Sequence, residues 1–131
     1  MLYPLYVWTF KVFIEDNGKN VIADWLQQLP SSAQEAIETR LRYLSVTEKW
    51  QRPAFDKLKG IDHIHEIRVK DHLANTEYRL LGCYGPNRKE FTLLIGTSKK
   101  GQVYDPKNCF ETVARRYKTF KKKGNVYDYE W

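Results

Sequence analysis

Basic side chains are concentrated around strand-like segments in the second half of this 131-residue sequence. Arg68 and Arg79 each lie within an apolar run, and the last such run, FTLLIGTSKK, ends in two adjacent lysines. A charged side chain within an apolar strand needs a partner or water. If the strands are neighbours, their cations converge on one face or rim of a sheet. The side chains suited to chemistry in this region belong to Lys57, Lys59, Glu66, Arg68, Lys70, Arg79, Lys99, Lys100 and Tyr104.

Such a cluster has the chemistry of a phosphate site. The arginine fork donates two hydrogen bonds to a phosphate and stays charged. Lysine, tyrosine or histidine can move protons once its pKa is tuned. RNA carries its own nucleophile, the 2′-hydroxyl, so its cleavage requires alignment, charge neutralisation and two proton transfers, but no metal. The structural alternative is a cross-strand pair of Arg79 with Glu66 and, for Arg68, a solvated strand face with Glu66 or Glu77 nearby.

Composition indicates a single folded domain spanning residues 1–131, because 42% of the residues are apolar. No apolar run approaches the roughly 18–20 residues that a membrane helix needs. The N-terminal sequence MLYPLYVWTFKVFI lacks the basic region and cleavage site of a signal peptide, and its β-branched and aromatic residues predict a strand. We therefore expect a soluble, cytoplasmic protein.

The net charge of +6 is unevenly distributed along the chain. Residues 1–48 hold 4 basic and 6 acidic residues, and residues 49–131 hold 18 basic and 10 acidic residues. A basic C-terminal part with interleaved aromatic residues suits a polyanion such as nucleic acid, and equally an acidic protein partner. Cys83 and Cys109 have no metal or redox spacing and are expected to be buried thiols. We expect no metal and no cofactor.

Two helices should follow the first strand, which we place at residues 3–14. Asn20 can cap the first helix, over VIADWLQQL. Ser32 has the spacing of a capping box with Glu35 at the start of the second. Each helix has one apolar stripe, so the two form a helical hairpin that packs on the sheet.

Three strands joined by short turns come next, in the segments HIHEIRVK, EYRLLGCYG and EFTLLIGTS. Asp105-Pro106 is expected to open a last helix, whose apolar face includes Phe110, and Gly124 to end it. The predicted fold is α+β: a small antiparallel sheet in β-α-α-β-β-β-α order, with the helical hairpin packed on it.

Alternation in the first of these three strands separates two faces. Ile67 and Val69 share one face with His63 and His65, which predicts core-facing, structural histidines. The opposite face carries Glu66, Arg68 and Lys70.

The segments FDKLKG, IHEIRVK, EYRLLGCY and FTLLIGTSKK, in this order, resemble the RelE/HigB-like toxins of type II toxin–antitoxin pairs, in the RelE/ParE superfamily. The resemblance covers residues 5–120 and leaves residues 121–131 as a C-terminal tail. It implies a metal-independent endoribonuclease that cleaves mRNA, often on the ribosome, by 2′-hydroxyl attack and so inhibits translation. It also implies an antitoxin, commonly a small helix-turn-helix DNA-binding protein, through which alone the toxin reaches operator DNA.

The resemblance assigns roles to individual residues. Arg79 and Arg68 match the family's phosphate-binding cations, while Lys57, Lys59, Lys70 and Lys99 are the expected RNA-binding lysines. Lys100 is expected in the catalytic group, nearer to Arg68 and Arg79 than Lys99 is. Tyr104 matches a family tyrosine with a two-residue offset. Glu66 replaces a basic residue of the best-known sites, and it could act as the base or orient Arg68.

Two other functions remain open at this point. A gyrase-inhibiting branch of the same superfamily keeps the fold without the nuclease residues. A non-catalytic nucleic-acid-binding regulatory module would retain the basic surface without cleaving RNA.

Overall fold

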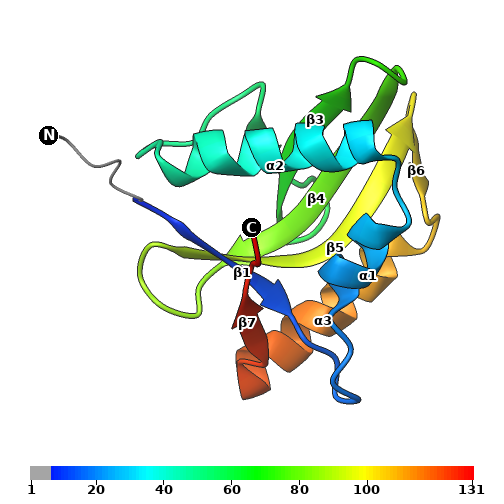
Figure 1. The fold of residues 1–131 in the computed structure, drawn as a ribbon. Helices are drawn as coiled ribbons and strands as arrows, with labels where there is room; N and C mark the ends of the chain where they lie inside the picture. The colour runs from blue at the N-terminus through cyan, green and yellow to red at the C-terminus, as the bar shows by residue number, and fades with distance from the viewer. Residues whose placement is uncertain (1–6) are drawn as a thin grey trace, which may run out of the picture.

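A seven-stranded sheet carries three helices in the computed structural model, which describes residues 7–131 (Figure 1). The elements in chain order are β1 (Thr9–Phe13), α1 (Val21–Gln27), α2 (Ser31–Ser45), β2 (Phe55–Lys57), β3 (His65–Asp71), β4 (Thr76–Tyr84), β5 (Glu90–Lys100), β6 (Val103–Asp105), α3 (Cys109–Lys123) and β7 (Val126–Asp128). The fold is α+β, as predicted.

The predicted meander forms the centre of the sheet. The strand order of the whole sheet is β2-β3-β4-β5-β1-β7, and β6 pairs with the end of β5. Strand β1 runs parallel to β5, whereas the other pairs are antiparallel. Strands β2, β6 and β7 were not predicted, because each has 3 residues and is too short to show a periodic pattern.

Of the features predicted for the N-terminal part, the first strand and the Asn20 cap are confirmed and the Ser32 capping box is not. The predicted first strand is confirmed over Thr9–Phe13, and its residues 3–6 lie outside the described part of the chain. The Asn20 cap is confirmed, since its Oδ1 accepts a hydrogen bond from the Ala23 amide at 3.0 Å. The Ser32 capping box is wrong. Helix α2 begins at Ser31, and the Ser32 hydroxyl donates instead to Asp71 Oδ2 at 2.7 Å, at the end of β3.

The last helix begins later than predicted. Asp105 belongs to β6, because its backbone pairs with Ser98 of β5, and α3 therefore starts at Cys109. Gly124 ends α3 as predicted, in the left-handed conformation with φ of 63°. No helix within residues 7–131 is long and apolar enough to span a membrane.

The helical hairpin of α1 and α2 covers one face of the sheet (Figure 1). Ile67 and Val69 of β3 and Leu80 of β4 are buried on this face, as the alternation predicted. Trp25 of α1 lies directly on Gly96 of β5. A Cβ atom at Gly96 would lie 2.2 Å from the Trp25 ring, so the hairpin can dock at this distance only over a glycine.

Helix α3 covers part of the opposite face. Val113 and Phe120 bury its apolar side, and Phe110 packs edge-on against Tyr104 of β6 with ring centroids 5.1 Å apart. The area of this face over β3, β4 and the end of β5 is left open to solvent as a pocket next to Phe110. The candidate site lies here.

We predict that Gly96→Ala lowers the free energy of unfolding by about 1–3 kcal/mol, because the new methyl group displaces Trp25 from the sheet. Urea denaturation measures the change. Ser98→Ala, on the same strand and face, should stay within about 0.5 kcal/mol of the wild type. Equal stability of the two variants would contradict the described docking of α1.

Candidate functional site

The strand register brings the predicted site residues onto one face. Arg68 of β3 pairs directly with Arg79 of β4, and Arg79 pairs with Thr97 of β5. Alternate residues of a strand share a face, so Glu66 and Lys99 lie on the same side as these three. Strand β6 places Tyr104 opposite Lys99. Residues separated by 38 positions, Glu66 and Tyr104, thereby come into hydrogen-bond contact.

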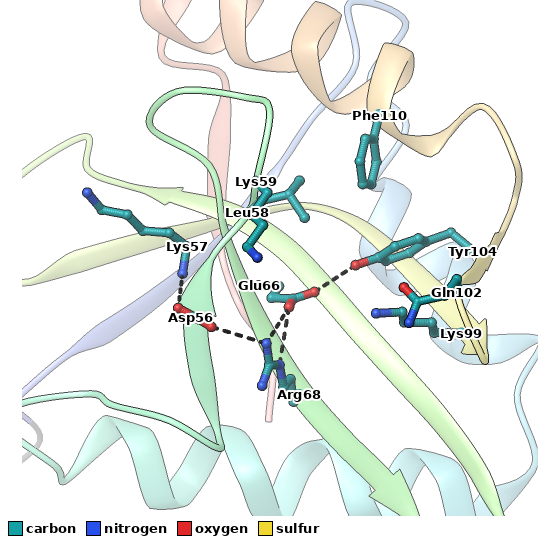
Figure 2. Close-up of a pocket in the computed structure, with 10 residues that line it drawn as sticks. All are labelled: Asp56, Lys57, Leu58, Lys59, Glu66, Arg68, Lys99, Gln102, Tyr104 and Phe110. Atoms are coloured by element: carbon teal, nitrogen blue, oxygen red, sulfur yellow. Dashed lines mark hydrogen bonds and ion pairs between the residues drawn. The ribbon is translucent and has the colours of Figure 1, made fainter.

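Glu66 is the centre of the site (Figure 2). Only 5% of the residue is exposed, and both carboxylate oxygens accept hydrogen bonds. Oε2 accepts hydrogen bonds from Arg68 Nε at 3.1 Å and Nη2 at 2.9 Å, while Oε1 accepts one from the Tyr104 hydroxyl at 2.8 Å. Arg79 Nε lies 3.6 Å from Oε1. Two guanidinium groups and a phenol thus offset the cost of burying this charge.

Arg68 joins Glu66 to Asp56. Asp56 of β2 lies directly across the strand pair from Glu66, and like charges in that position repel each other. Arg68 Nη2 lies 3.2 Å from Asp56 Oδ2 and so bridges the two carboxylates. The third nitrogen, Nη1, has no hydrogen-bond partner among residues 7–131, and 32% of the side chain is exposed. Arg68 can therefore still donate to a ligand.

Arg79 is buried behind Glu66 and Arg68 and does not line the pocket. The residue is 8% exposed. Nη2 donates to Glu77 at 3.2 Å and Nη1 donates to the Tyr78 carbonyl at 3.1 Å. Its Nε is buried without a hydrogen-bond partner in the described chain. The cross-strand pairing with Glu66 that is the structural alternative for Arg79 is thus present.

A pocket of about 440 Å³ opens above Glu66 and Arg68. Its lining residues are Asp56, Lys57, Leu58, Lys59, Glu66, Arg68, Lys99, Gln102, Tyr104 and Phe110. Figure 2 shows Lys59 and Lys99 directed toward the Glu66–Arg68 pair, whereas the Lys57 side chain points away along the edge of the sheet. The pocket therefore has a buried anionic group at its floor and ammonium groups at its rim.

Tyr104, the candidate tyrosine, lines the pocket, and its hydroxyl faces Glu66. Burial raises the pKa of the Tyr104 phenol, and the hydrogen bond to Glu66 raises this pKa further. The Lys99 ammonium lies 5.0 Å from the centre of the Tyr104 ring, on its π face. Tyr104 thus keeps its proton at neutral pH and serves as a hydrogen-bond donor.

Lys100 is not in the site, so the prediction that it lies nearer than Lys99 is wrong. Because Arg79 pairs with Thr97, the residue two positions along, Lys99, shares the face of Arg79, and Lys100 points to the other side. Lys99 lines the pocket with Glu66, whereas Lys100 lines a neighbouring hollow at the rim. Lys70, on the face of Arg68 but two residues farther out, lines the same neighbouring hollow.

The two histidines differ from each other. The prediction that His63 faces the core is wrong, because His63 lies in the turn before β3 with φ of 70° and stacks on Tyr117 of α3. His65 is partly buried and stacks on Phe55 with ring centroids 5.0 Å apart, in a structural position. Burial lowers the pKa of His65. Neither histidine lines the Glu66 pocket.

Sequence reasoning missed four lining residues: Asp56, Leu58, Gln102 and Phe110. Asp56 and Gln102 lie in or beside strands of 3 residues, which carry no periodic signal. Phe110 was assigned to the apolar face of the last helix, and only the packing of α3 beside Tyr104 shows that it also reaches the pocket.

The predicted buried thiols are confirmed: Cys83 and Cys109 are both 1% exposed, and burial raises the pKa of Cys83 to about 12.

The family model described as "Phage derived protein Gp49-like (DUF891)" matches residues 24–118. This range begins within α1, ends within α3 and contains every residue that lines the pocket. A search among curated proteins gave no match.

We predict that Glu66→Gln lowers the pKa of Tyr104 toward that of an ordinary tyrosine, because the variant removes the negative charge that opposes ionisation of the phenol. Burial remains, so the shift is partial. NMR titration of ¹³C-labelled tyrosine measures it, with Tyr104→Phe assigning the signal. Glu77→Gln, which removes an acid that does not contact Tyr104, should leave the pKa unchanged. An unchanged Tyr104 pKa in Glu66→Gln would contradict the described contact.

Proposed function

The chain belongs to the Gp49-like family of phage-derived proteins, which is associated with toxin–antitoxin systems, and from this premise we propose that it is the toxin of such a pair and an endoribonuclease that cleaves mRNA. One observation carries the enzymatic part of the proposal. A buried carboxylate, that of Glu66, lies at the floor of an open pocket between Arg68 and Tyr104, with lysines at the rim. An anion-binding pocket with a fixed base suits a phosphodiester that carries its own nucleophile.

Glu66 is the general base in this proposal. Its carboxylate removes the proton from the 2′-hydroxyl of the bound ribonucleotide, and the 2′-oxygen attacks the adjacent phosphorus. The bond from phosphorus to the 5′-oxygen then breaks. The products are a 2′,3′-cyclic phosphate and a 5′-hydroxyl, once the departing oxygen has received a proton. A positioned base of this kind contributes about 10²–10⁴-fold to the rate.

The rim supplies the cations. Arg68 Nη1 and the Lys59 ammonium bind the non-bridging phosphate oxygens, where negative charge accumulates during attack. Lys99 gives a proton to the departing 5′-oxygen, since its side chain extends from β5 into the pocket on the side opposite Lys57 (Figure 2). Solvent then takes the proton from Glu66 and returns one to Lys99.

Three residues act through others in this scheme. Tyr104 fixes Glu66 Oε1 with its hydroxyl proton. Asp56 holds Arg68 over the pocket from β2. Arg79, which the sequence pattern assigned to the phosphate, supports the charge of Glu66 from below and is a positioning residue here.

The proposed partners follow from the same premise. The toxin associates with an antitoxin, which in the HigB-like branch is commonly a helix-turn-helix protein, and binds operator DNA only through it. Its substrate is mRNA, taken on the ribosome, so that cleavage inhibits translation. The excess of basic residues after residue 48 supports both a nucleic-acid substrate and an acidic inhibitor.

We predict that Glu66→Gln reduces mRNA cleavage by at least about 10²-fold and abolishes growth arrest on expression, because it removes the base. Cleavage is measured on mRNA alone and on translating ribosomes, with RNA ends mapped. Glu111→Gln, at an exposed position of α3, makes the same change of charge and should retain wild-type cleavage. Urea denaturation of both variants separates loss of chemistry from loss of fold.

Equal cleavage by folded Glu66→Gln and Glu111→Gln would remove Glu66 from the reaction. Wild-type protein that arrests growth with DNA damage signalling and intact mRNA would establish gyrase inhibition instead. Protein that is harmless but binds RNA in a salt-dependent way would establish a non-catalytic binding module.

A further inference from the structure

We propose that the Glu66 pocket is the middle of a continuous cationic groove that holds single-stranded RNA on both sides of the cleaved bond, with Lys70 and Lys100 binding a flanking phosphate. This inference rests on the ribonuclease function proposed above. It gives Lys100 a role at the rim in place of the catalytic one that the sequence indicated.

Three adjoining hollows make up the groove. The Glu66 pocket shares Lys57 with a hollow of about 450 Å³ at the β2–β3 turn, which also contains His63 and His65. On its other side it shares Lys99 with a hollow of about 680 Å³ between the β3–β4 and β5–β6 turns. In Figure 2, Lys57 and Lys99 lie on opposite sides of Glu66. A strand that crosses the Glu66 pocket therefore meets a further hollow at each end.

The cations along this groove divide into two groups. The arginines, Arg68 and Arg79, form ion pairs with Glu66, Asp56 and Glu77, and Arg68 keeps only Nη1 for a ligand. The second group consists of lysines that make no ion pair with any residue in the range 7–131. They are Lys57, Lys59, Lys70, Lys99 and Lys100. By contrast, Lys11, Lys19 and Lys123 elsewhere on the chain are each paired with an acid.

This separation identifies the occupant as an anionic strand. The lysines leave net positive charge in the Glu66 pocket and in the rim hollow. The rim hollow has Glu77 alone beside three lysines, and Glu77 is already paired with Arg79, whereas the hollow at the β2–β3 turn has one acid, Asp62, beside Lys57. A positively charged groove that follows the backbone is the general means of holding single-stranded nucleic acid.

The buried floor further favours a single strand. Glu66 is 5% exposed and lines the pocket, so the reacting 2′-hydroxyl and phosphate must enter the pocket to meet its carboxylate. A flexible strand can turn its backbone inward in this way, whereas a regular RNA duplex holds its backbone in fixed helical geometry. The next phosphate along the strand then lies near Lys99, Lys70 and Lys100, which converge on the rim hollow from β3 and β5.

The test measures binding without cleavage. The probe is a fluorescein-labelled, fully 2′-O-methylated oligonucleotide of about 12 nucleotides and mixed sequence, whose nucleophile is blocked. Fluorescence anisotropy gives its Kd across a salt series. For the double variant Lys70→Ala/Lys100→Ala we expect roughly tenfold weaker binding at low salt, and a slope of log K against log salt that is shallower by about 0.7, from the loss of one neutralised phosphate.

Two double variants serve as controls. Lys118→Ala/Lys122→Ala removes the same charge from exposed positions of α3 and should bind like the wild type. Lys70→Arg/Lys100→Arg keeps the charge and should also retain binding. If Lys70→Ala/Lys100→Ala and Lys118→Ala/Lys122→Ala give the same Kd and slope, the groove does not extend to the rim hollow and the inference is wrong.

A parallel reaction with unmodified RNA of the same sequence and with translating ribosomes distinguishes this inference from the ribonuclease proposal. If the wild type cleaves RNA and the two alanine variants bind the probe equally well, the groove inference is wrong and the ribonuclease proposal stands. Lysine-dependent binding of the probe with all RNA left intact overturns the ribonuclease proposal and supports the groove as a binding surface. Cleavage with lysine-dependent binding supports both, and in that case the Lys70→Ala/Lys100→Ala variant should raise KM and leave kcat unchanged.

Discussion

The site depends on one buried negative charge. Glu66 is almost fully enclosed, and its carboxylate is tolerated because Arg68, Arg79 and Tyr104 reach it from three different strands. Removing one member of such a cluster leaves the others uncompensated, which for a buried charge pair costs about 3–5 kcal/mol. The strands β3, β4 and β6 are therefore held in register by the same contacts that arrange the site. In the proposed function, the residues that stabilise the sheet are also those of the site, which limits how far the site can change.

The two faces of the sheet differ: one is apolar and buried under helices, and the other carries the polar residues of the pocket. The hairpin of α1 and α2 buries the apolar residues of β3 and β4 on one face, so that the polar residues between them must all point to the other face. Helix α3 covers only part of that second face and leaves Glu66 at the floor of an open pocket. The rim lysines extend into solvent there, and their charge is not neutralised within residues 7–131. Folding thus pairs the two acids of the pocket, Asp56 and Glu66, with Arg68 and leaves the rim lysines unpaired within the described residues.

Sequence reasoning predicted the parts that depend on local pattern. Alternation in β3 correctly separated Ile67 and Val69 from Glu66 and Arg68, and the helical stripes correctly predicted the hairpin. Lys99 and Lys100 were confused because their faces depend on the pairing of Thr97 with Arg79, which no single strand reveals. Asp56 was missed because β2 has 3 residues and exists only through its pairing with β3. The buried position of Arg79 was equally inaccessible, since an arginine under a carboxylate and an arginine facing a phosphate have the same sequence pattern.

The central claim is that the pocket aligns an RNA 2′-hydroxyl for attack on its own phosphate, with Glu66 as the base. The most direct test is to map the cleaved bond in an RNA substrate and to replace the ribose on its 5′ side with 2′-deoxyribose, then to determine the product ends by mass spectrometry. With Glu66 as the base, the unmodified RNA should give a 2′,3′-cyclic phosphate and a 5′-hydroxyl, and the substituted position should not be cleaved. Cleavage that continues at the 2′-deoxy position, or products that end in a 3′-hydroxyl, would contradict this claim.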